Sequence, residues 1–161
     1  MKALITGASS GIGRDMARIL SKKGYELVLV ARDNDKLKEV KEELEKETKV
    51  EIISVDLTNE ENCKEIHNKV QNVDLLINNA GFGDCGDFTK TSLEKDINMI
   101  KTNIIAYHIL TKLYLKDMKE KNKGDVYKRQ IESTKFKPFF SCQKEQCKSL
   151  LLISDNMRSP S

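Results

Sequence analysis

A glycine-rich stretch near the start of the chain has the composition of a phosphate-binding turn. It reads Thr6-Gly-Ala-Ser-Ser-Gly-Ile-Gly-Arg14 and directly follows the apolar run at positions 3–5. Glycines at positions 7, 11 and 13 permit a tight turn and let the backbone approach a pyrophosphate, which free N–H groups and the positive end of a helix stabilise. The stretch lacks the Lys-Ser/Thr pair that a nucleoside-triphosphate loop needs. It therefore favours a dinucleotide over ATP, and the alternative is a glycine-rich turn that binds no ligand.

Arg32 occupies the position at which dinucleotide-binding proteins distinguish NAD from NADP. It follows the apolar run at positions 27–31 and lies about twenty residues beyond the glycine-rich stretch. An acidic residue at such a place holds the ribose 2′-hydroxyl of NAD, whereas a guanidinium pairs with the 2′-phosphate of NADP through two hydrogen bonds. We therefore expect NADP, with NAD as the less favoured cofactor. Asp33 could serve the hydroxyl of NAD, and Arg32 as a solvated strand end is a third interpretation.

Two further groups of candidate residues follow apolar runs. Asp56 comes after the run at 52–55, and the sequence Asn-Asn-Ala-Gly at 78–81 comes after the run at 75–77. Ligands of open α/β sheets bind at the carboxyl ends of the strands. We expect Asp56 to accept a hydrogen bond from the adenine amino group, and the small residues Ala80 and Gly81 to lie against the adenosine ribose. The alternative for Asp56 is a turn residue without a ligand.

Short apolar runs alternate with amphipathic stretches from Lys2 to about Lys121. This alternation is typical of βα units and of a parallel sheet. Continuous apolar runs at 3–5, 27–31 and 75–77 predict strands covered on both faces, whereas the mixed run at 52–55 suits an edge strand. Four βα units are predicted. The fold class is therefore α/β, with a doubly wound parallel sheet.

The predicted helices carry apolar residues at helical spacing and recognisable end signals. Asp33–Asp35 supply N-cap candidates, Thr58 and Glu61 form a candidate capping box, and Gly24 is a helix stop. The last helix, at about 92–120, is apolar on more than one side, which indicates a packed or subunit-facing helix. The stripes expected to lie in the core are Ile12, Met16, Ile19 and Leu20, then Leu37, Val40 and Leu44, then Cys63, Ile66 and Val70.

Composition excludes several classes of protein. The 161 residues include 39% apolar and 33% charged residues, with a formal charge of +3 and four cysteines. These values describe one soluble domain with no basic stripe for nucleic acid, and no apolar run approaches membrane-spanning length. The scattered cysteines, without CxxC or paired histidines, predict neither a metal site nor a disulfide framework. We expect reduced thiols and a cytoplasmic location.

Taken together, the Thr-Gly-x-x-x-Gly-x-Gly loop, Asp56 and the Asn-Asn-Ala-Gly sequence resemble the classical short-chain dehydrogenase/reductase family over residues 1 to about 124. The resemblance implies a Rossmann-type sheet with strand order 3-2-1-4-5-6-7, a homodimer or homotetramer, and hydride transfer between NAD(P) and a small carbonyl or alcohol substrate. It implies that Asn103 supports a water in the proton relay. It places pyrophosphate contacts at Gly7, Ser9, Ser10, Gly11, Ile12 and Gly13, adenine contacts at Asp56 and Leu57, and ribose contacts at Asn79, Ala80 and Gly81.

The chain departs from this family after Gly124. It contains no Tyr-x-x-x-Lys, and the segment at 125–130 is charged where a buried apolar strand is expected. We therefore expect the sheet to stop after the fourth βα unit, with a Rossmann domain at 1–124 and a non-matching tail at 125–161. The segment at 125–130 is similar to translated sequencing-adapter sequence, so the tail is interpreted as artefactual or out of frame. A divergent ending, with a replacement strand at 149–154, is the alternative.

Three functions remain open from the sequence. The first is a short-chain oxidoreductase whose printed chain lacks the catalytic Ser and Tyr-x-x-x-Lys and is therefore expected to be inactive. The second is a non-catalytic NADP-binding or scaffolding protein. The third is a Rossmann-like methyltransferase, which Arg32 disfavours because such sites place an acid on the ribose hydroxyls.

Overall fold

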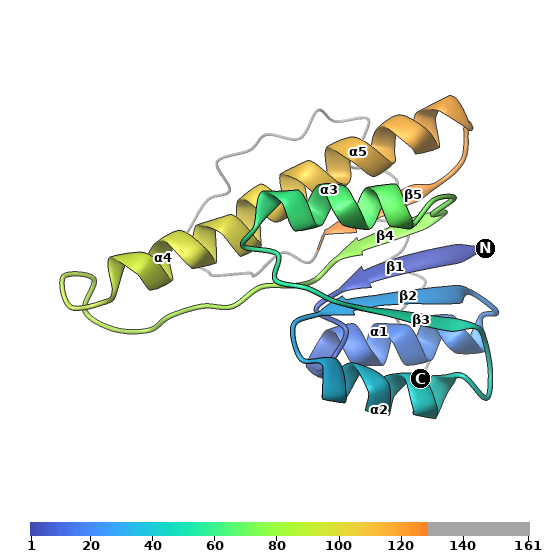
Figure 1. Cartoon of the computed structure of the whole chain (residues 1–161), viewed down its shortest axis with the longest axis horizontal. Helices are drawn as coiled ribbons and strands as arrows, with labels where there is room; N and C mark the ends of the chain where they lie inside the picture. The colour runs from blue at the N-terminus through green and yellow to red at the C-terminus, as the bar shows by residue number, and fades with distance from the viewer. Residues whose placement is uncertain (129–161) are drawn as a thin grey trace, which may run out of the picture. The chain divides into compact units, whose positions relative to one another are not determined.

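The computed structural model of the chain describes residues 1–128, which form one parallel sheet with helices on both faces (Figure 1). The strands lie in the order β3-β2-β1-β4-β5. The elements are β1 (Lys2–Thr6), α1 (Gly11–Lys22), β2 (Glu26–Ala31), α2 (Asn34–Leu44), β3 (Val50–Ser54), α3 (Glu60–Lys69), β4 (Leu75–Asn78), α4 (Leu93–Ile100), the π-helix η1 (Lys101–Ala106), α5 (Tyr107–Glu120) and β5 (Asp125–Lys128). The predicted doubly wound sheet is confirmed.

Strand order follows the burial of each apolar run. The continuous runs form the inner strands β1, β2 and β4, while the mixed run forms β3 at the edge of the sheet. All four strand pairs are parallel. Parallel strands therefore direct their carboxyl ends to one edge, where the predicted site residues stand.

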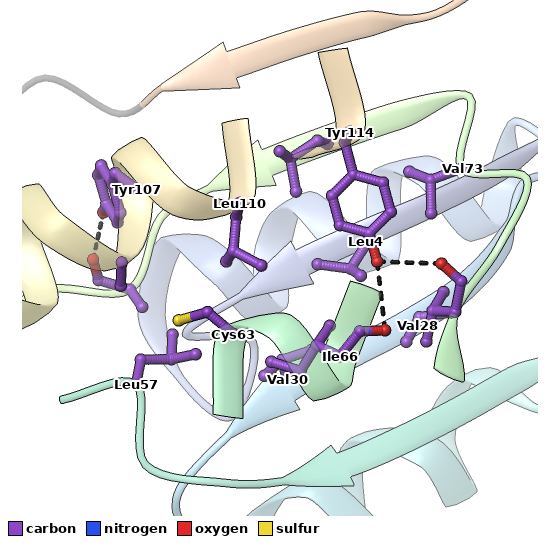
Figure 2. Close-up of a cluster of buried hydrophobic side chains, with 14 of the residues drawn as sticks. Leu4, Val28, Val30, Leu57, Cys63, Ile66, Val73, Tyr107, Leu110 and Tyr114 are labelled. Atoms are coloured by element: carbon purple, nitrogen blue, oxygen red, sulfur yellow. Dashed lines mark hydrogen bonds between the residues drawn. The ribbon is translucent and has the colours of Figure 1, made fainter. Parts of the chain in front are cut away.

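Helices α3 and α5 cover one face of the sheet, and α1 and α2 cover the other (Figure 1). Alternate strand residues such as Leu4, Val28 and Leu76 point to the α3 and α5 side, because successive side chains of a strand face opposite ways. There they pack around Tyr114, which is 1% exposed (Figure 2). The Tyr114 hydroxyl donates to the Val70 carbonyl at 3.1 Å, so its buried polar group is satisfied.

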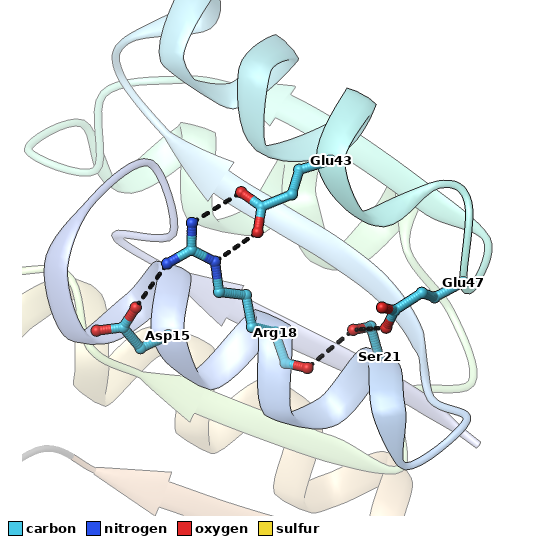
Figure 3. A network of polar contacts seen from close by, with 5 residues as sticks. All are labelled: Asp15, Arg18, Ser21, Glu43 and Glu47. Carbon is cyan, nitrogen blue, oxygen red and sulfur yellow. Dashed lines mark hydrogen bonds and ion pairs between the residues drawn. The ribbon is translucent and has the colours of Figure 1, made fainter.

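A polar network joins α1 to α2 on the opposite face (Figure 3). The Arg18 guanidinium contacts both carboxylate oxygens of Glu43, at 2.5 and 2.8 Å, and Asp15 at 3.1 Å. The neighbouring Ser21 hydroxyl lies 2.9 Å from a Glu47 carboxylate oxygen. This bidentate pairing links the two helices at the protein surface.

Most of the predicted helical stripes lie in the core, but two of their members do not. Ile12 and Ile19 are 45% and 41% exposed, so their assignment to the core is wrong. Helix α1 buries Gly13, Met16, Ala17 and Leu20 instead. Each exposed isoleucine precedes a member of that stripe by one residue, which turns its side chain about 100° away around the helix.

The helix ends agree with the predicted signals in part. The Asp33 carboxylate caps α2 by accepting from the Lys36 N–H at 3.1 Å, and Gly24 ends the turn after α1 with φ of +76°. The capping box expected at Thr58 does not form. Instead Asn59 caps α3 by accepting from the Glu61 N–H at 3.0 Å.

A fifth strand occupies a segment for which the sequence predicted none. Strand β5 pairs in parallel with β4, with Leu76 opposite Val126 and Ile77 opposite Tyr127. Its charged ends are exposed, and only the two middle residues are half-buried. A strand with one neighbour in the described part of the sheet needs no continuous apolar run, so the expectation of no strand at 125–128 is wrong. The candidate strand at 149–154 lies outside the described residues.

No helix within residues 1–128 combines the length and the apolar character needed to cross a membrane.

Candidate functional site

Thr6, at the end of β1, joins the glycine-rich turn to the end of β4. Its hydroxyl oxygen accepts hydrogen bonds from the backbone N–H groups of Asn79 and Ala80, each at 3.0 Å. In return the Asn79 amide donates to the Thr6 and Gly7 carbonyl oxygens, each at 3.1 Å. Thr6, Asn79 and Ala80 are all buried. Two motifs that lie more than seventy residues apart in the sequence are thus held as one unit.

Close packing requires glycine at two positions of this unit. A Cβ on Gly7 would lie 2.7 Å from the Ala80 Cα, and Gly7 also has φ of +67°. A Cβ on Gly13 would lie 2.2 Å from the Gly7 carbonyl oxygen. Because both distances are far below van der Waals contact, the turn folds tightly only with these glycines.

The N-terminus of α1 carries no side-chain cap. Ser10 occupies the N-cap position without a cap hydrogen bond, whereas Asp33, Asn59 and Ser92 cap the helices that follow them. The first N–H groups of a helix have no partner within the helix and attract anions. Gly11 has φ of +53°, and a Cβ built there would meet nothing within 4 Å. The turn therefore presents open backbone N–H groups at a positive helix end.

A cavity of about 510 Å³ lies beyond the carboxyl ends of β2 and β3. It brings together Arg32 and Asp56, the two predicted residues that follow those strands. The other lining residues come from the turn before α3, the connection after β4, and the N-cap and first turns of α4. The complete lining is Arg32, Asp56, Thr58, Phe82, Ser92, Glu94, Lys95 and Asn98.

Arg32 and Asp33 stand side by side in the chain but have different partners. Asp33 accepts from the Lys36 N–H, and its carboxylate also lies 3.3 Å from the Lys36 ammonium. The Lys36 backbone N–H, with its ammonium, holds the pKa of Asp33 below the usual range. Arg32 lines the cavity, and its guanidinium has no ion pair with any residue of the described chain. An anionic ligand in the cavity would find this guanidinium available.

Asp56 uses only part of its hydrogen-bonding capacity within the protein. One carboxylate oxygen accepts from the Thr58 N–H at 3.0 Å, which shapes the turn before α3. A carboxylate has two oxygens that each accept more than one hydrogen bond. Asp56 therefore has acceptor capacity left for a ligand amino group in the cavity.

Asn103 holds the connection that follows β4. Its amide donates to the Phe82 carbonyl oxygen at 2.8 Å and accepts from the Phe82 N–H at 3.1 Å. Next to it the Tyr107 hydroxyl donates to the Ala80 carbonyl oxygen. A Cβ on Gly81 would lie 2.9 Å from the Asn103 amide oxygen, so glycine allows this approach. Both side chains project from η1 or the residue after it, where the wider π-helical turn interrupts the long helix.

Not every predicted residue lines the cavity. Leu57 is 5% exposed and its side chain packs in the hydrophobic core. The glycine-rich turn, Asn79 and Ala80 adjoin one another outside the cavity lining. Sequence reasoning missed Phe82 and the α4 residues Lys95 and Asn98, although it predicted a helix from about Ser92. Residues 1–128 contain no cluster of three or more His, Cys, Asp or Glu side chains that could hold a metal ion.

Comparisons with known proteins agree with this architecture. The short chain dehydrogenase family model matches residues 1–130. A bovine very-long-chain 3-oxoacyl-CoA reductase is 34% identical over 140 residues, which cover 77% of this chain and 42% of the reductase. A 3-oxoacyl-[acyl-carrier-protein] reductase of Rickettsia prowazekii is 32% identical and is covered to 51%. The chain thus spans about half the length of the curated relatives it matches.

A solved structure shares both the fold and a recognisable level of identity. A short-chain dehydrogenase from Sphingobium yanoikuyae, in complex with NADPH, superposes with a TM-score of 0.75 at 31% identity, covering 79% of this chain and 52% of that one. The matched residues include the whole βα framework and the strand-end motifs described above. The chain therefore belongs to the short chain dehydrogenase family.

Proposed function

We propose that this chain binds NADP(H) at the carboxyl edge of its sheet. The glycine-rich turn and the N-terminus of α1 hold the pyrophosphate, and Arg32 pairs with the 2′-phosphate. Asp56 accepts from the adenine amino group. The proposed cofactor contacts are Gly7, Ser9, Ser10, Gly11, Ile12 and Gly13 for the pyrophosphate, Arg32, Asp56 and Leu57 for the adenosine end, and Asn79, Ala80 and Gly81 for the ribose.

One observation carries the preference for NADP over NAD. Arg32 lines the cavity and has no ion pair in the described chain, while the carboxylate of Asp33 already caps α2. A ribose 2′-hydroxyl would have to share the Asp33 carboxylate with the Lys36 N–H and ammonium, whereas no such group competes for the Arg32 guanidinium in the described chain. The relative solved with NADPH supports the same cofactor.

The reaction proposed for the whole protein is hydride transfer between NADP(H) and a small carbonyl or alcohol substrate. Asn103 is proposed to support a proton-relay water beside the loop that it holds at Phe82. The printed sequence contains no Tyr-x-x-x-Lys. We therefore propose that this chain itself binds the cofactor without reducing a carbonyl. The alternative is a non-catalytic NADP-binding or scaffolding protein. A complete coding sequence with Tyr-x-x-x-Lys favours the enzyme, and one without it favours the alternative.

Titration of the Arg32→Ala variant tests the proposed function. Loss of a charge-assisted contact to phosphate is expected to raise the Kd for NADPH about tenfold while the Kd for NADH changes less than about twofold. Lys38→Ala is the matched control, because Lys38 pairs with Asp35 on α2 and does not line the cavity. Equal affinity of the original chain for NADPH and NADH, or no binding of either, contradicts the proposal.

Self-association is proposed through the exposed apolar residues of the α4 and η1 segment. Leu93, Ile97, Ile100 and Ile104 are 73%, 43%, 47% and 48% exposed and recur at helical spacing. Such a stripe on a helix is expected to pack against another surface. We propose a homodimer or homotetramer of the whole protein, which sedimentation of the chain and of Ile97→Glu would test. A monomeric original chain contradicts it.

A cytoplasmic location is part of the same proposal. Within residues 1–128, Cys63 and Cys85 form no disulfide, as reducing compartments favour.

A further inference from the structure

The cavity has a second positive residue that the proposed cofactor contacts do not use. Lys95 lies in the first turn of α4, where the Ser92 hydroxyl caps the helix by accepting from the Lys95 N–H. Arg32 reaches the same cavity from the end of β2. Among the residues that line it, these two are the cations. They come from parts of the chain more than sixty residues apart, and the cavity is what brings them together.

Lys95 is paired with a residue that does not line the cavity. Its ammonium lies 2.9 Å from a carboxylate oxygen of Asp84, in the connection between β4 and α4. The side chain of Lys95 is 51% exposed and that of Asp84 is 22% exposed, so solvent reaches the pair mainly from the lysine side. Exposed pairs of this kind are weak, and a stronger anion can replace the carboxylate. The Lys95 ammonium is thus available to the cavity at small cost.

The charge of the expected ligand calls for more than one cation. A phosphate monoester carries between one and two negative charges at neutral pH and has three acceptor oxygens. Arg32 supplies a single positive charge and can satisfy two of those oxygens in a bidentate contact. A third oxygen and the remaining charge are then left for a second donor. Lys95 is the remaining cation of the cavity lining.

We propose that Lys95 is a specificity-determining residue for the 2′-phosphate of NADP(H), exchanging Asp84 for a phosphate oxygen when the cofactor binds. This inference rests on the proposed function. No covalent bond changes in the exchange, because one ion pair is replaced by another. Asp84 therefore competes with the cofactor for the Lys95 ammonium. The alternative is that the Asp84–Lys95 pair only holds the loop against α4.

Removing each partner separately distinguishes competition from a structural tie. If Lys95 binds phosphate, Lys95→Met weakens NADPH binding, whereas Asp84→Asn strengthens it by removing the negative charge that competes for the ammonium. If the pair only ties the loop to the helix, both variants loosen the cavity and weaken binding. Asparagine keeps the oxygen that accepts from the Cys85 N–H at 3.0 Å, so the local turn is preserved. The sign of the Asp84→Asn effect therefore decides between the two roles.

The experiment titrates the full chain and its variants with NADPH and NADH at low and at moderate salt. Lys95→Met is expected to raise the Kd for NADPH about fivefold, less than a fully buried contact would, and to leave the Kd for NADH within about twofold. Asp84→Asn is expected to lower the Kd for NADPH about twofold. The difference between the original chain and Lys95→Met should shrink as salt screens the contact.

Lys90→Met is the matched control, because Lys90 lies in the same connection, pairs with Asp87 and does not line the cavity. An unchanged Kd for NADPH in Lys95→Met, or an equal loss of NADPH and NADH binding, overturns the role of Lys95. If Arg32→Ala still loses NADPH affinity in the same assay, the proposed function stands while this inference fails. If the original chain binds no NADPH, both fall.

Discussion

At the scale of residues, the sequence predicts which kinds of contact a site can make. It does not predict which of two adjacent side chains makes each contact. The spacing of Gly7 and Gly13 indicated a tight turn, and the structure shows the close approaches that require it. The sequence left Arg32 and Asp33 as rival partners of a ribose. The sequence also offered Asp33 as one of three N-cap candidates. The fold selects it, because capping depends on where the helix begins, and it leaves Arg32 without an ion pair in the described chain.

Thr6 gives a prediction about this scale. Thr6→Val removes the oxygen that accepts from two buried N–H groups, so the free energy of unfolding should fall by about 3 kcal/mol. Thr6→Ser keeps that oxygen and should cost about 1 kcal/mol, for the lost methyl group. Denaturant unfolding of the chain and of both variants measures the difference. Equal losses in the free energy of unfolding for the valine and serine variants would show that the Thr6 hydroxyl does not stabilise the fold through these hydrogen bonds.

Cys63 and Cys85 are predicted to differ in reactivity. Burial raises the pKa of the Cys63 thiol to about 11, whereas Cys85 is exposed. Since the thiolate is the reactive form, iodoacetamide at pH 8 should modify Cys85 in the native chain and spare Cys63. Peptide mass spectrometry reads each site, and denatured chain supplies the control in which both react. Comparable labelling of the two sites in native chain would contradict the buried environment of Cys63.

The same burial predicts a loss of stability in alkali. The ordinary pKa of a thiol is 9.0, so the unfolded chain releases this proton at lower pH than the folded chain does. Above that pH the unfolded state binds fewer protons, and the free energy of unfolding therefore falls as pH rises from about 9 to about 11. Cys63→Ala should flatten this part of the profile. If the free energy of unfolding of Cys63→Ala falls as steeply between pH 9 and pH 11, groups other than Cys63 cause the loss of stability.

At the scale of elements, the spacing of apolar residues predicted four of the strands and most of the helices. It did not predict strand β5 or the π-helical turn η1. The apolar runs located β1, β2 and β4 because inner strands of a parallel sheet need apolar residues on both faces. Strand β5 was not predicted, because its two half-buried residues, Val126 and Tyr127, lie between charged residues. The long helix was expected, but its π-helical turn η1 was not, because no sequence period marks a single wide turn.

The turn between β1 and α1 supplies a prediction for an element. Gly13→Ala places a Cβ within 2.2 Å of the Gly7 carbonyl oxygen, so the backbone must shift. The expected cost is about 1–3 kcal/mol of stability together with weaker NADPH binding. Gly83→Ala is the matched control, since a Cβ there meets nothing within 4 Å. Thermal unfolding and NADPH titration compare the two variants. Similar behaviour of both would contradict the tight packing of the turn.

At the scale of the whole molecule, the strand order concentrates distant motifs at one edge. The ends of β1 and β4 meet through Thr6 and Asn79, and the ends of β2 and β3 bring Arg32 and Asp56 to one cavity. The sequence predicted this edge because parallel strands point the same way. It did not predict that α4 would add Lys95 to the cavity, because the placement of a helix relative to a sheet depends on packing that no local pattern encodes.

The most direct test of the account is a map of the backbone amides that respond to the cofactor. Isotope-labelled chain is titrated with NADPH and followed by two-dimensional NMR, with NADH as the comparison. The account predicts the largest shifts for the amides of Gly7 to Arg14 and of Arg32, with saturation at lower concentrations of NADPH than of NADH. Absence of shifts at the glycine-rich turn, or equal saturation by the two cofactors, would contradict it.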